Sequence, residues 1–243
     1  MAASAPACHR TLRSSSFGAR LGPEVWRAVT GAGTYVRLPP GSALMREGDP
    51  PGRVFIIVEG WVRVVATSAD GRESLLAVRG PGDLVGELAA LRGANRAASV
   101  RSMTAVDAVR FSADELVGVI QRLPAVGEAI MADLAERVVD AGHQLIAREV
   151  ERTEERLVGL LRRLLGEAGR GATASAAVAL ELPLSQEDLG DLIGASRESV
   201  ARALCRLRAA GVLATNRRSI VVLDVSALSE TSLRPGADLA GMR

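Results

Sequence analysis

The hydrophobic pattern divides this sequence into a strand-rich part followed by a helix-rich part. Between residues 34 and 111 the apolar positions form short β-branched runs, such as Val54–Val58 and Val62–Val65, and glycines separate them. The Asp70-Gly71 pair between two such runs is a strong signal for a tight hairpin. Further glycines stand at positions 48, 80, 82 and 93. This spacing of breaks predicts a β-sandwich or β-barrel.

A helical pattern replaces the strand pattern from Pro124 onwards. Five apolar residues recur at spacings of three, four, three and four, namely Met131, Leu134, Val138, Ala141 and Leu145. Such a stripe suits a seam between two helices, so we predict that it forms a homodimer interface. The alternative is a helix that packs only on its own barrel. A charged stretch at Arg148–Arg156 precedes a second helical pattern at Leu157–Leu165.

Signals for two short helices follow near the C-terminal end. Ser185 is a predicted N-cap with Asp188 three positions later, which approximates a capping box although Asp replaces Glu or Gln. Gly194-Ala195 predicts a tight turn, and Ser196 caps a second helix that ends at Ala210-Gly211. A hairpin is then predicted from the runs Val212–Ala214 and Ile220–Leu223 and the turn Asn216–Ser219. This order of elements predicts a winged helix-turn-helix.

These patterns divide the chain into five parts. We predict a disordered tail at 1–20, a β domain at 21–123, a dimerisation helix and hinge at 124–152, a winged helix-turn-helix domain at 153–225, and a C-terminal tail at 226–243.

Charge indicates the partner of the C-terminal domain. The 243 residues carry a net charge of only +2, so the whole molecule lacks the field of a nucleic-acid binder. Locally, however, residues 196–218 contain one acidic residue, Glu198, and six arginines, at positions 197, 202, 206, 208, 217 and 218. A basic patch shared by a helix and its wing suits double-stranded DNA. A solvated charged helix face is the alternative.

The composition excludes several classes of site. Two cysteines and two histidines are too few for a disulfide framework, an iron–sulfur cluster or a histidine-rich metal site. We therefore expect no metal and no cofactor, and we find no catalytic constellation of an enzyme. The apolar runs contain charges and are too short to span a membrane, and the N-terminus lacks the apolar core of a signal peptide. We expect a cytoplasmic protein without a membrane partner.

The segment Gly190–Arg202 closely resembles the recognition signature of the cyclic-AMP receptor protein and fumarate–nitrate regulator (Crp/Fnr) superfamily of bacterial transcription regulators. The resemblance extends from about residue 21 to 224, and Arg197-Glu198-x-x-x-Arg202 is more similar to the cyclic-AMP receptor branch. It implies an α+β fold with an N-terminal cyclic-nucleotide-binding β-roll, a jelly-roll barrel, then a long dimerisation helix and a C-terminal winged helix-turn-helix. Arg197 and Arg202 are expected to pair with guanine, and Glu198 with cytosine. Expected contacts to the DNA backbone come from Ser185, Gln186, Ser199, Arg217 and Arg218.

A second motif lies in the β domain, where Gly86-Glu87-Leu88 is followed nine residues after the glutamate by Arg96-Ala97. This spacing resembles the phosphate-binding cassette of cyclic-nucleotide domains, so the β domain would be a sensor. The resemblance implies that Arg96 binds the cyclic phosphate and that Glu87 accepts a hydrogen bond from the ribose 2′-hydroxyl. Arg137 stands where the family places a partner for that glutamate. Ala97 in place of Thr is more similar to cyclic-AMP sites than to cyclic-GMP sites.

One departure concerns the base end of this site. Cyclic-AMP-responsive bacterial members cap adenine with hydroxyl groups on the dimerisation helix, and the matching positions here are Ala141 and Gly142. Neither side chain donates a hydrogen bond. Three alternatives stay open, which are cyclic AMP, another nucleotide, or a site without ligand in which Glu87 and Arg96 form a plain ion pair.

The resulting hypothesis is a homodimeric transcription regulator that binds a pseudo-palindromic DNA site and is switched by cyclic AMP or a related nucleotide. RNA polymerase is the expected further partner. The alternative is a constitutive DNA-binding regulator with a degenerate ligand site. An alternative of another class, a cyclic-nucleotide-controlled enzyme, would need catalytic residues that the sequence does not show.

Overall fold

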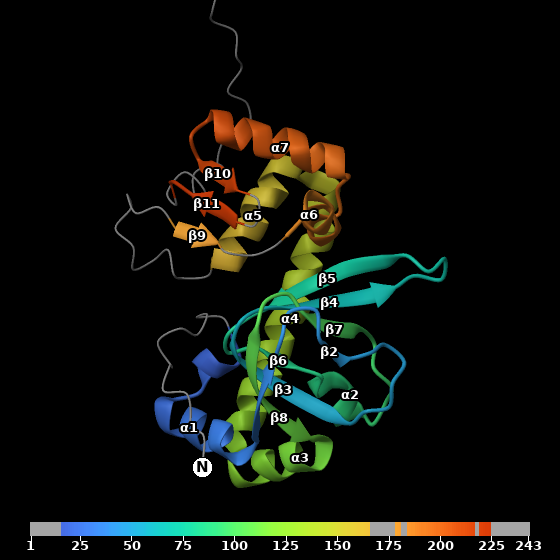
Figure 1. Ribbon diagram of the computed structural model, residues 1–243, viewed down its shortest axis with the longest axis vertical. Coiled ribbons are helices and arrows are strands. Elements are labelled where there is room, and N and C mark those ends of the chain that lie inside the picture. The colour runs from blue at the N-terminus through green and yellow to red at the C-terminus, as the bar shows by residue number, and fades with distance from the viewer. Residues whose placement is uncertain (1–15, 166–177, 181–183, 217–218, 225–243) are drawn as a thin grey trace, which may run out of the picture. The chain divides into compact units, whose positions relative to one another are not determined.

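The computed structural model describes residues 16–165, 178–180, 184–216 and 219–224 (Figure 1). The chain divides into two compact units, Met1–Gln144 and Leu145–Arg243. Two four-stranded sheets belong to the first unit, and one three-stranded sheet belongs to the second.

The sheets of the N-terminal unit are antiparallel throughout. One sheet has the order β1 (Thr34–Leu38), β8 (Val106–Ser112), β3 (Arg53–Glu59) and β6 (Leu84–Val85). The other has the order β2 (Ala43–Met45), β7 (Ser99–Ser102), β4 (Val62–Thr67) and β5 (Glu73–Arg79). The predicted hairpin at Asp70-Gly71 joins β4 to β5. The unit therefore has the two-sheet architecture that the spacing of glycines predicted.

Strand β3 is buried on both faces, which explains its unbroken apolar run. Phe55 and Ile57 belong to a core cluster that includes Val100 of the second sheet. Val54 and Ile56 belong to a different cluster, which contains residues of the helices. Because successive side chains of a strand point to opposite faces, this one strand contributes to both clusters.

Three helices pack against β3 and β8 through that second cluster, namely α1 (Pro23–Ala32), α3 (Ala113–Arg122) and the first turns of α4 (Pro124–Val150). Sequence analysis did not predict α1 or α3. Each has only ten residues and therefore shows few repeats of the helical period.

The N-terminal boundary differs from the predicted disordered tail at 1–20. Phe17 is fully buried in the core, and residues Gly18–Arg20 form a 3-10 turn. The Gly18 amide donates to the Gly82 carbonyl at 2.8 Å. The prediction is therefore wrong for residues 16–20, and residues 1–15 lie outside the described part of the chain.

Only two residues separate helix α4 from the next helix. It ends at Val150, and α5 (Thr153–Leu165) begins after Glu151 and Arg152. The Arg152 amide donates to Glu155 Oε2 at 2.8 Å, which satisfies a donor at the start of α5. The non-helical connection is therefore shorter than the charged stretch Arg148–Arg156, most of which is helical.

In the described residues, the C-terminal unit combines the end of α4 and three further helices with a small sheet. The helices are α5, α6 (Gln186–Ile193) and α7 (Arg197–Ala209), and the sheet has the order β10 (Leu213–Asn216), β11 (Ser219–Val222) and β9 (Val178–Leu180). The predicted helix-turn-helix and hairpin are present, and the α+β fold class is confirmed. Strand β9 was not predicted, because three residues carry too little pattern. Arg217 and Arg218 lie outside the described residues.

Two kinds of feature are absent from the described ranges. No helix there combines the length and the hydropathy that a membrane span requires. No group of three or more His, Cys, Asp or Glu side chains there is arranged to hold a metal ion.

Candidate functional site

A glycine places the start of helix α2 (Glu87–Arg92) against two other segments of the β domain. Gly86 has φ +90°, a conformation that L side chains rarely adopt. A Cβ at this position would come within 2.8 Å of the Arg53 carbonyl oxygen and 2.9 Å of Arg96 Nη1. Glycine therefore allows this turn to touch the arginine that the sequence assigns to the same site.

Arg96 is a buried cation that backbone carbonyls hold in place. The residue is 5% exposed, and its Nη1 and Nη2 donate to the carbonyls of Gly86 and Arg53 at 2.7 and 2.6 Å. Burial lowers the pKa of this guanidinium, and the charges of Glu87 and Asp49 oppose that effect. Within the described residues, no carboxylate forms an ion pair with Arg96. A buried charge is usually paired, so this group has the chemistry to bind an anion.

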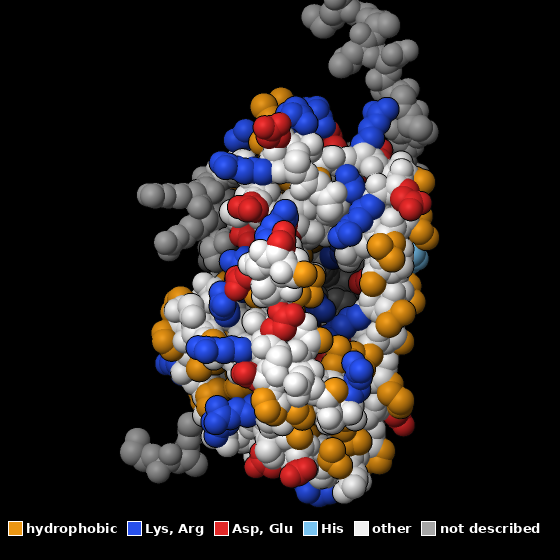
Figure 2. All heavy atoms as spheres, turned by 90° about the vertical axis from the view of Figure 1, so that its right-hand side faces the viewer, with side chains coloured by type: hydrophobic (Ala, Val, Ile, Leu, Met, Phe, Trp, Pro, Cys, Tyr) orange, Lys and Arg blue, Asp and Glu red, His pale blue; other side chains and the backbone are white. Residues whose placement is uncertain are grey.

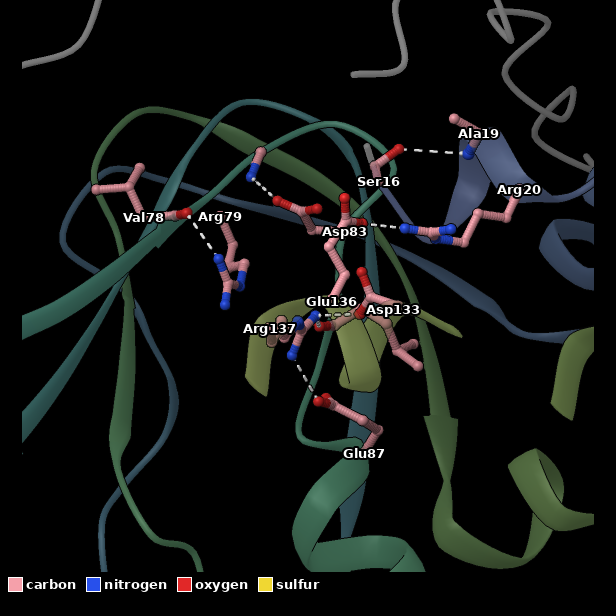
Figure 3. Close-up of polar contacts among 12 residues, drawn as sticks. Ser16, Ala19, Arg20, Val78, Arg79, Asp83, Glu87, Asp133, Glu136 and Arg137 are labelled. Atoms are coloured by element: carbon pink, nitrogen blue, oxygen red, sulfur yellow. Dashed lines mark hydrogen bonds and ion pairs between the residues drawn. The ribbon is translucent and has the colours of Figure 1, made fainter. Parts of the chain in front are cut away.

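Glu87 pairs with the long helix instead of with Arg96 (Figure 3). It is 2% exposed, and its Oε1 accepts a hydrogen bond from Arg137 Nη1 at 2.8 Å. Arg137 Nη2 lies 2.7 Å from Asp133 Oδ2 and donates to the Leu84 carbonyl at 3.0 Å. The alternative of a plain ion pair between Glu87 and Arg96 is therefore wrong. Arg137 lies beside Glu87, where the resemblance placed it.

The other residues assigned to the ligand site carry no side-chain donor. Leu88 is 48% exposed, and Ala97 and Ala141 are exposed as well. A Cβ at Gly142 would meet no atom within 4 Å. Recognition by polar side chains at this site therefore depends on Glu87, Arg96 and Arg137.

Serine residues start both helices of the helix-turn-helix. Ser185 Oγ accepts from the Asp188 amide at 3.0 Å, and Asp188 Oδ2 accepts from the Ser185 amide at 2.9 Å, so aspartate completes the capping box. Ser196 Oγ accepts from the amide three residues later at 3.2 Å. Gly194 has φ +64°, which ends α6 and turns the chain. Ser185 and Gln186 are exposed at the start of α6.

Helix α7 is polar on one side and packs into its domain on the other. Its buried residues are Val200, Ala203, Leu204 and Leu207. Arg197, Glu198 and Arg202 are exposed. Arg202 Nη2 donates to Ser199 Oγ at 3.0 Å, and its Nη1 lies 3.9 Å from Glu198 Oε2. The predicted base-reading side chains therefore share the exposed side of one helix.

One contact of α7 could not be found from the local charge count. Arg206 Nε lies 2.5 Å from Glu154 Oε2 on α5, which is 52 residues away in sequence. Arg208 Nη1 donates to Thr215 Oγ1 on β10 at 3.2 Å. Residues 196–218 carry a net charge of +5, from six arginines and one glutamate. Because Arg206 is paired within the domain, this value overstates the positive charge that remains for DNA.

Helix α4 leaves a row of large apolar side chains in contact with solvent. In the predicted stripe, Met131, Val138 and Leu145 are 65%, 72% and 62% exposed, Ala141 is exposed, and Leu134 is partly buried against the core. The structure adds three exposed residues that the stripe did not include, namely Val139, Ile146 and Val150. Figure 2 shows hydrophobic side chains in a row along the right-hand edge of the view. A long exposed apolar row is typical of a protein interface.

Two family profiles match the two units. The profile of the cyclic nucleotide-binding domain matches residues 35–123, which include Gly86, Glu87 and Arg96. The profile of the Crp-like helix-turn-helix domain matches residues 155–231, which include α6 and α7.

Relatives and solved structures match most of the chain. It is 31% identical over 211 residues to a CRP-like cAMP-activated global transcriptional regulator of Mycobacterium tuberculosis, across 85% of this chain and 92% of the relative. It is 29% identical over 192 residues to a cyclic AMP receptor protein of Thermus thermophilus, across 79% and 85%. The structure of the c-di-GMP responsive global regulator CLP of Xanthomonas campestris aligns with a TM-score of 0.65 and 25% identity, across 83% of this chain and 99% of that chain.

Proposed function

Because the chain belongs to the Crp/Fnr superfamily of bacterial transcription regulators, we propose that its DNA binding is controlled by a cyclic nucleotide, with cyclic AMP as the ligand. Members of this family are DNA-binding regulators and not enzymes. This protein is likewise a DNA-binding regulator and not an enzyme. Both the resemblance in sequence and its predicted function class are thereby confirmed.

The observation that carries the ligand proposal is the state of Arg96. An ion pair with Glu87 would have neutralised this arginine and removed the need for a ligand. Instead its buried guanidinium is oriented by two carbonyls, which are dipoles and carry no compensating charge. A cyclic phosphate would supply that charge. Glu87, fixed by Arg137, would accept a hydrogen bond from a ribose hydroxyl.

The charges of the site favour a cyclic mononucleotide over a cyclic dinucleotide. The names of similar proteins include both a cAMP-activated and a c-di-GMP responsive regulator. A mononucleotide brings one phosphate, which matches Arg96, whose guanidinium has no carboxylate partner among the described residues. A dinucleotide brings two phosphates, and Arg137, the other guanidinium of the site, is already paired with Glu87 and Asp133.

The dimer and its DNA contacts complete the proposal. We assign the exposed apolar row of α4 to a homodimer, which would present two copies of α7 to successive major grooves about 34 Å apart. Arg197, Glu198 and Arg202 would then read base edges. Contacts to the DNA backbone would come from Ser185, Gln186, Ser199, Arg217 and Arg218. Action in the cytoplasm with RNA polymerase as a partner belongs to the same proposal.

Fluorescence anisotropy tests the switch directly. The labelled duplex is a palindrome with GTG and CAC half-site cores, and a random duplex of equal length is the control at the same salt concentration. We expect cyclic AMP to tighten binding to the palindrome by at least about tenfold more than binding to the random duplex. Cyclic GMP and c-di-GMP are added in parallel. Equal and tight palindrome binding under all conditions would instead establish a constitutive regulator.

A further inference from the structure

A buried carboxylate that the proposed ligand contacts do not use lies one turn before Arg137 on helix α4. Asp133 is 6% exposed, and its Oδ2 lies 2.7 Å from Arg137 Nη2. The same guanidinium uses Nη1 for Glu87 and Nη2 also for the Leu84 carbonyl. Figure 3 shows Arg137 between the two carboxylates, one from its own helix and one from α2.

The charges around Asp133 leave this cluster one positive charge short. Glu87 and Asp133 share the single charge of Arg137, so these three groups carry one negative charge in excess. Burial raises the pKa of the Asp133 carboxyl, Arg137 opposes that rise, and Asp83 adds to it. Two weaker effects act on the same pKa. Arg79 at the end of β5 lowers it, and Glu87 raises it.

We propose that Asp133 is a positioning residue that holds Arg137 against Glu87 and that takes up a proton when a nucleotide phosphate enters the site. This inference rests on the proposed function, because it requires the ligand to bind beside Arg96 and Glu87. It makes the strength of nucleotide binding a function of pH.

The direction of that dependence follows from linkage. A bound phosphate adds a negative charge to the site, which makes the charged form of Asp133 less favourable, so binding and protonation favour each other. The cyclic phosphate stays a monoanion around neutral pH and contributes no proton of its own. Nucleotide affinity therefore increases as the pH falls through the titration of Asp133, and is constant at higher pH.

Isothermal titration calorimetry of the full-length protein with cyclic AMP, from about pH 5.5 to about pH 8, tests this inference. We expect the affinity to rise as the pH falls, by at most about tenfold per pH unit, because one proton accompanies each nucleotide. Asp133→Asn should bind with an affinity that changes little with pH and that exceeds the unsubstituted protein's affinity at about pH 8 several-fold. Asp133→Glu keeps a carboxyl group and should restore the dependence on pH.

A matched control comes from the neighbouring carboxylate on the same helix. Glu136 is half-exposed and forms its ion pair with Arg20, so Glu136→Gln should keep the pH dependence of the unsubstituted protein. If Asp133→Asn keeps that dependence as well, the inference is overturned while the proposed function stands. If Asp133→Asn fails to fold, the test is the proton uptake of the unsubstituted protein on nucleotide binding. Calorimetry in two buffers of different ionisation enthalpy measures that uptake. Zero uptake overturns the inference. If no cyclic nucleotide binds at any pH, the proposed function fails and this inference fails with it.

Discussion

Arg96 carries a buried positive charge whose hydrogen bonds, among the described residues, go to the carbonyls of Gly86 and Arg53. Its substitution therefore tests the ligand site most directly. Because charge-assisted hydrogen bonds contribute about 1.5–3 kcal/mol each, we expect Arg96→Ala to weaken cyclic AMP binding by about 10- to 100-fold or more. Calorimetry at fixed pH and salt measures the change. Arg101→Ala is the matched control, because Arg101 is an exposed arginine on β7 that pairs with Glu73 on β5. Unchanged affinity in Arg96→Ala would contradict the assigned role.

Arg202 is the residue whose removal should change which bases are read. It is exposed on α7 and held by Ser199. We expect Arg202→Ala to lose about 1–3 kcal/mol of specific binding and to relax the preference at one base position in each half-site. Anisotropy on a set of duplexes with single base changes measures this loss. Arg208→Ala, which removes a hydrogen bond to Thr215, should leave the base preference unchanged. An equal loss on every duplex would show that Arg202 contacts phosphate instead.

Single residues also show where sequence reasoning reached its limit. Glu87, Arg96 and Arg137 were selected because the family spacing marks them, and the structure brings all three to the start of α2. The ion pair between Asp133 and Arg137 was missed, although the spacing of four residues suits a helical ion pair. The Glu154–Arg206 pair left no signal, because a contact between residues 52 positions apart depends on how the helices pack.

At the scale of elements, the sequence predicted the turns and helix starts that depend on neighbouring residues. The Asp70-Gly71 hairpin and the N-caps of α6 and α7 depend on residues within a few positions, and each lies where the sequence predicted it. Burial of Phe17 and pairing of β9 depend on distant partners, and neither was predicted. The apolar row of α4 was found only in part, because the predicted stripe includes neither Val139 nor Ile146, and both are exposed in the structure.

Two glycine-to-alanine substitutions test whether the turn of the helix-turn-helix needs its close packing. A Cβ at Gly190 would lie 2.5 Å from the Ala195 carbonyl oxygen, which is backbone and cannot move aside without opening the turn. We expect Gly190→Ala to lower the free energy of unfolding by about 1–3 kcal/mol and to weaken DNA binding. At Gly159 on α5 the nearest atom to a Cβ is Arg163 Nη1 at 3.9 Å, so Gly159→Ala should stabilise the protein by up to about 1 kcal/mol. Urea unfolding measures both variants, and equal effects would contradict this account of the turn.

At the scale of the whole molecule, regulation of a palindromic site requires two DNA-binding units in a fixed relation. In one protomer, α4 exposes apolar side chains along several turns, including Met131, Val138 and Leu145. Leaving this surface in water costs free energy that a second copy would recover, at roughly 25 cal/mol per Å² of apolar area buried. A twofold axis along α4 would pair the same face of both copies and place their two α7 helices for two half-sites.

Val138→Glu tests that assembly, because Val138 is 72% exposed in the protomer and its substitution should not disturb the fold of one chain. In a dimer it would place two glutamates in an apolar seam, and a buried unpaired charge costs several kcal/mol. We therefore expect light scattering after size-exclusion chromatography to report a monomer where the unsubstituted protein is a dimer. Palindrome affinity should fall by about 100-fold or more, and the salt dependence of random-DNA binding should fall by about half, since half of the phosphate contacts are lost. Leu76→Glu, at an apolar residue of β5 that is 56% exposed, is the control and should stay dimeric. A Val138→Glu protein that remains a dimer with full palindrome affinity would place the interface elsewhere.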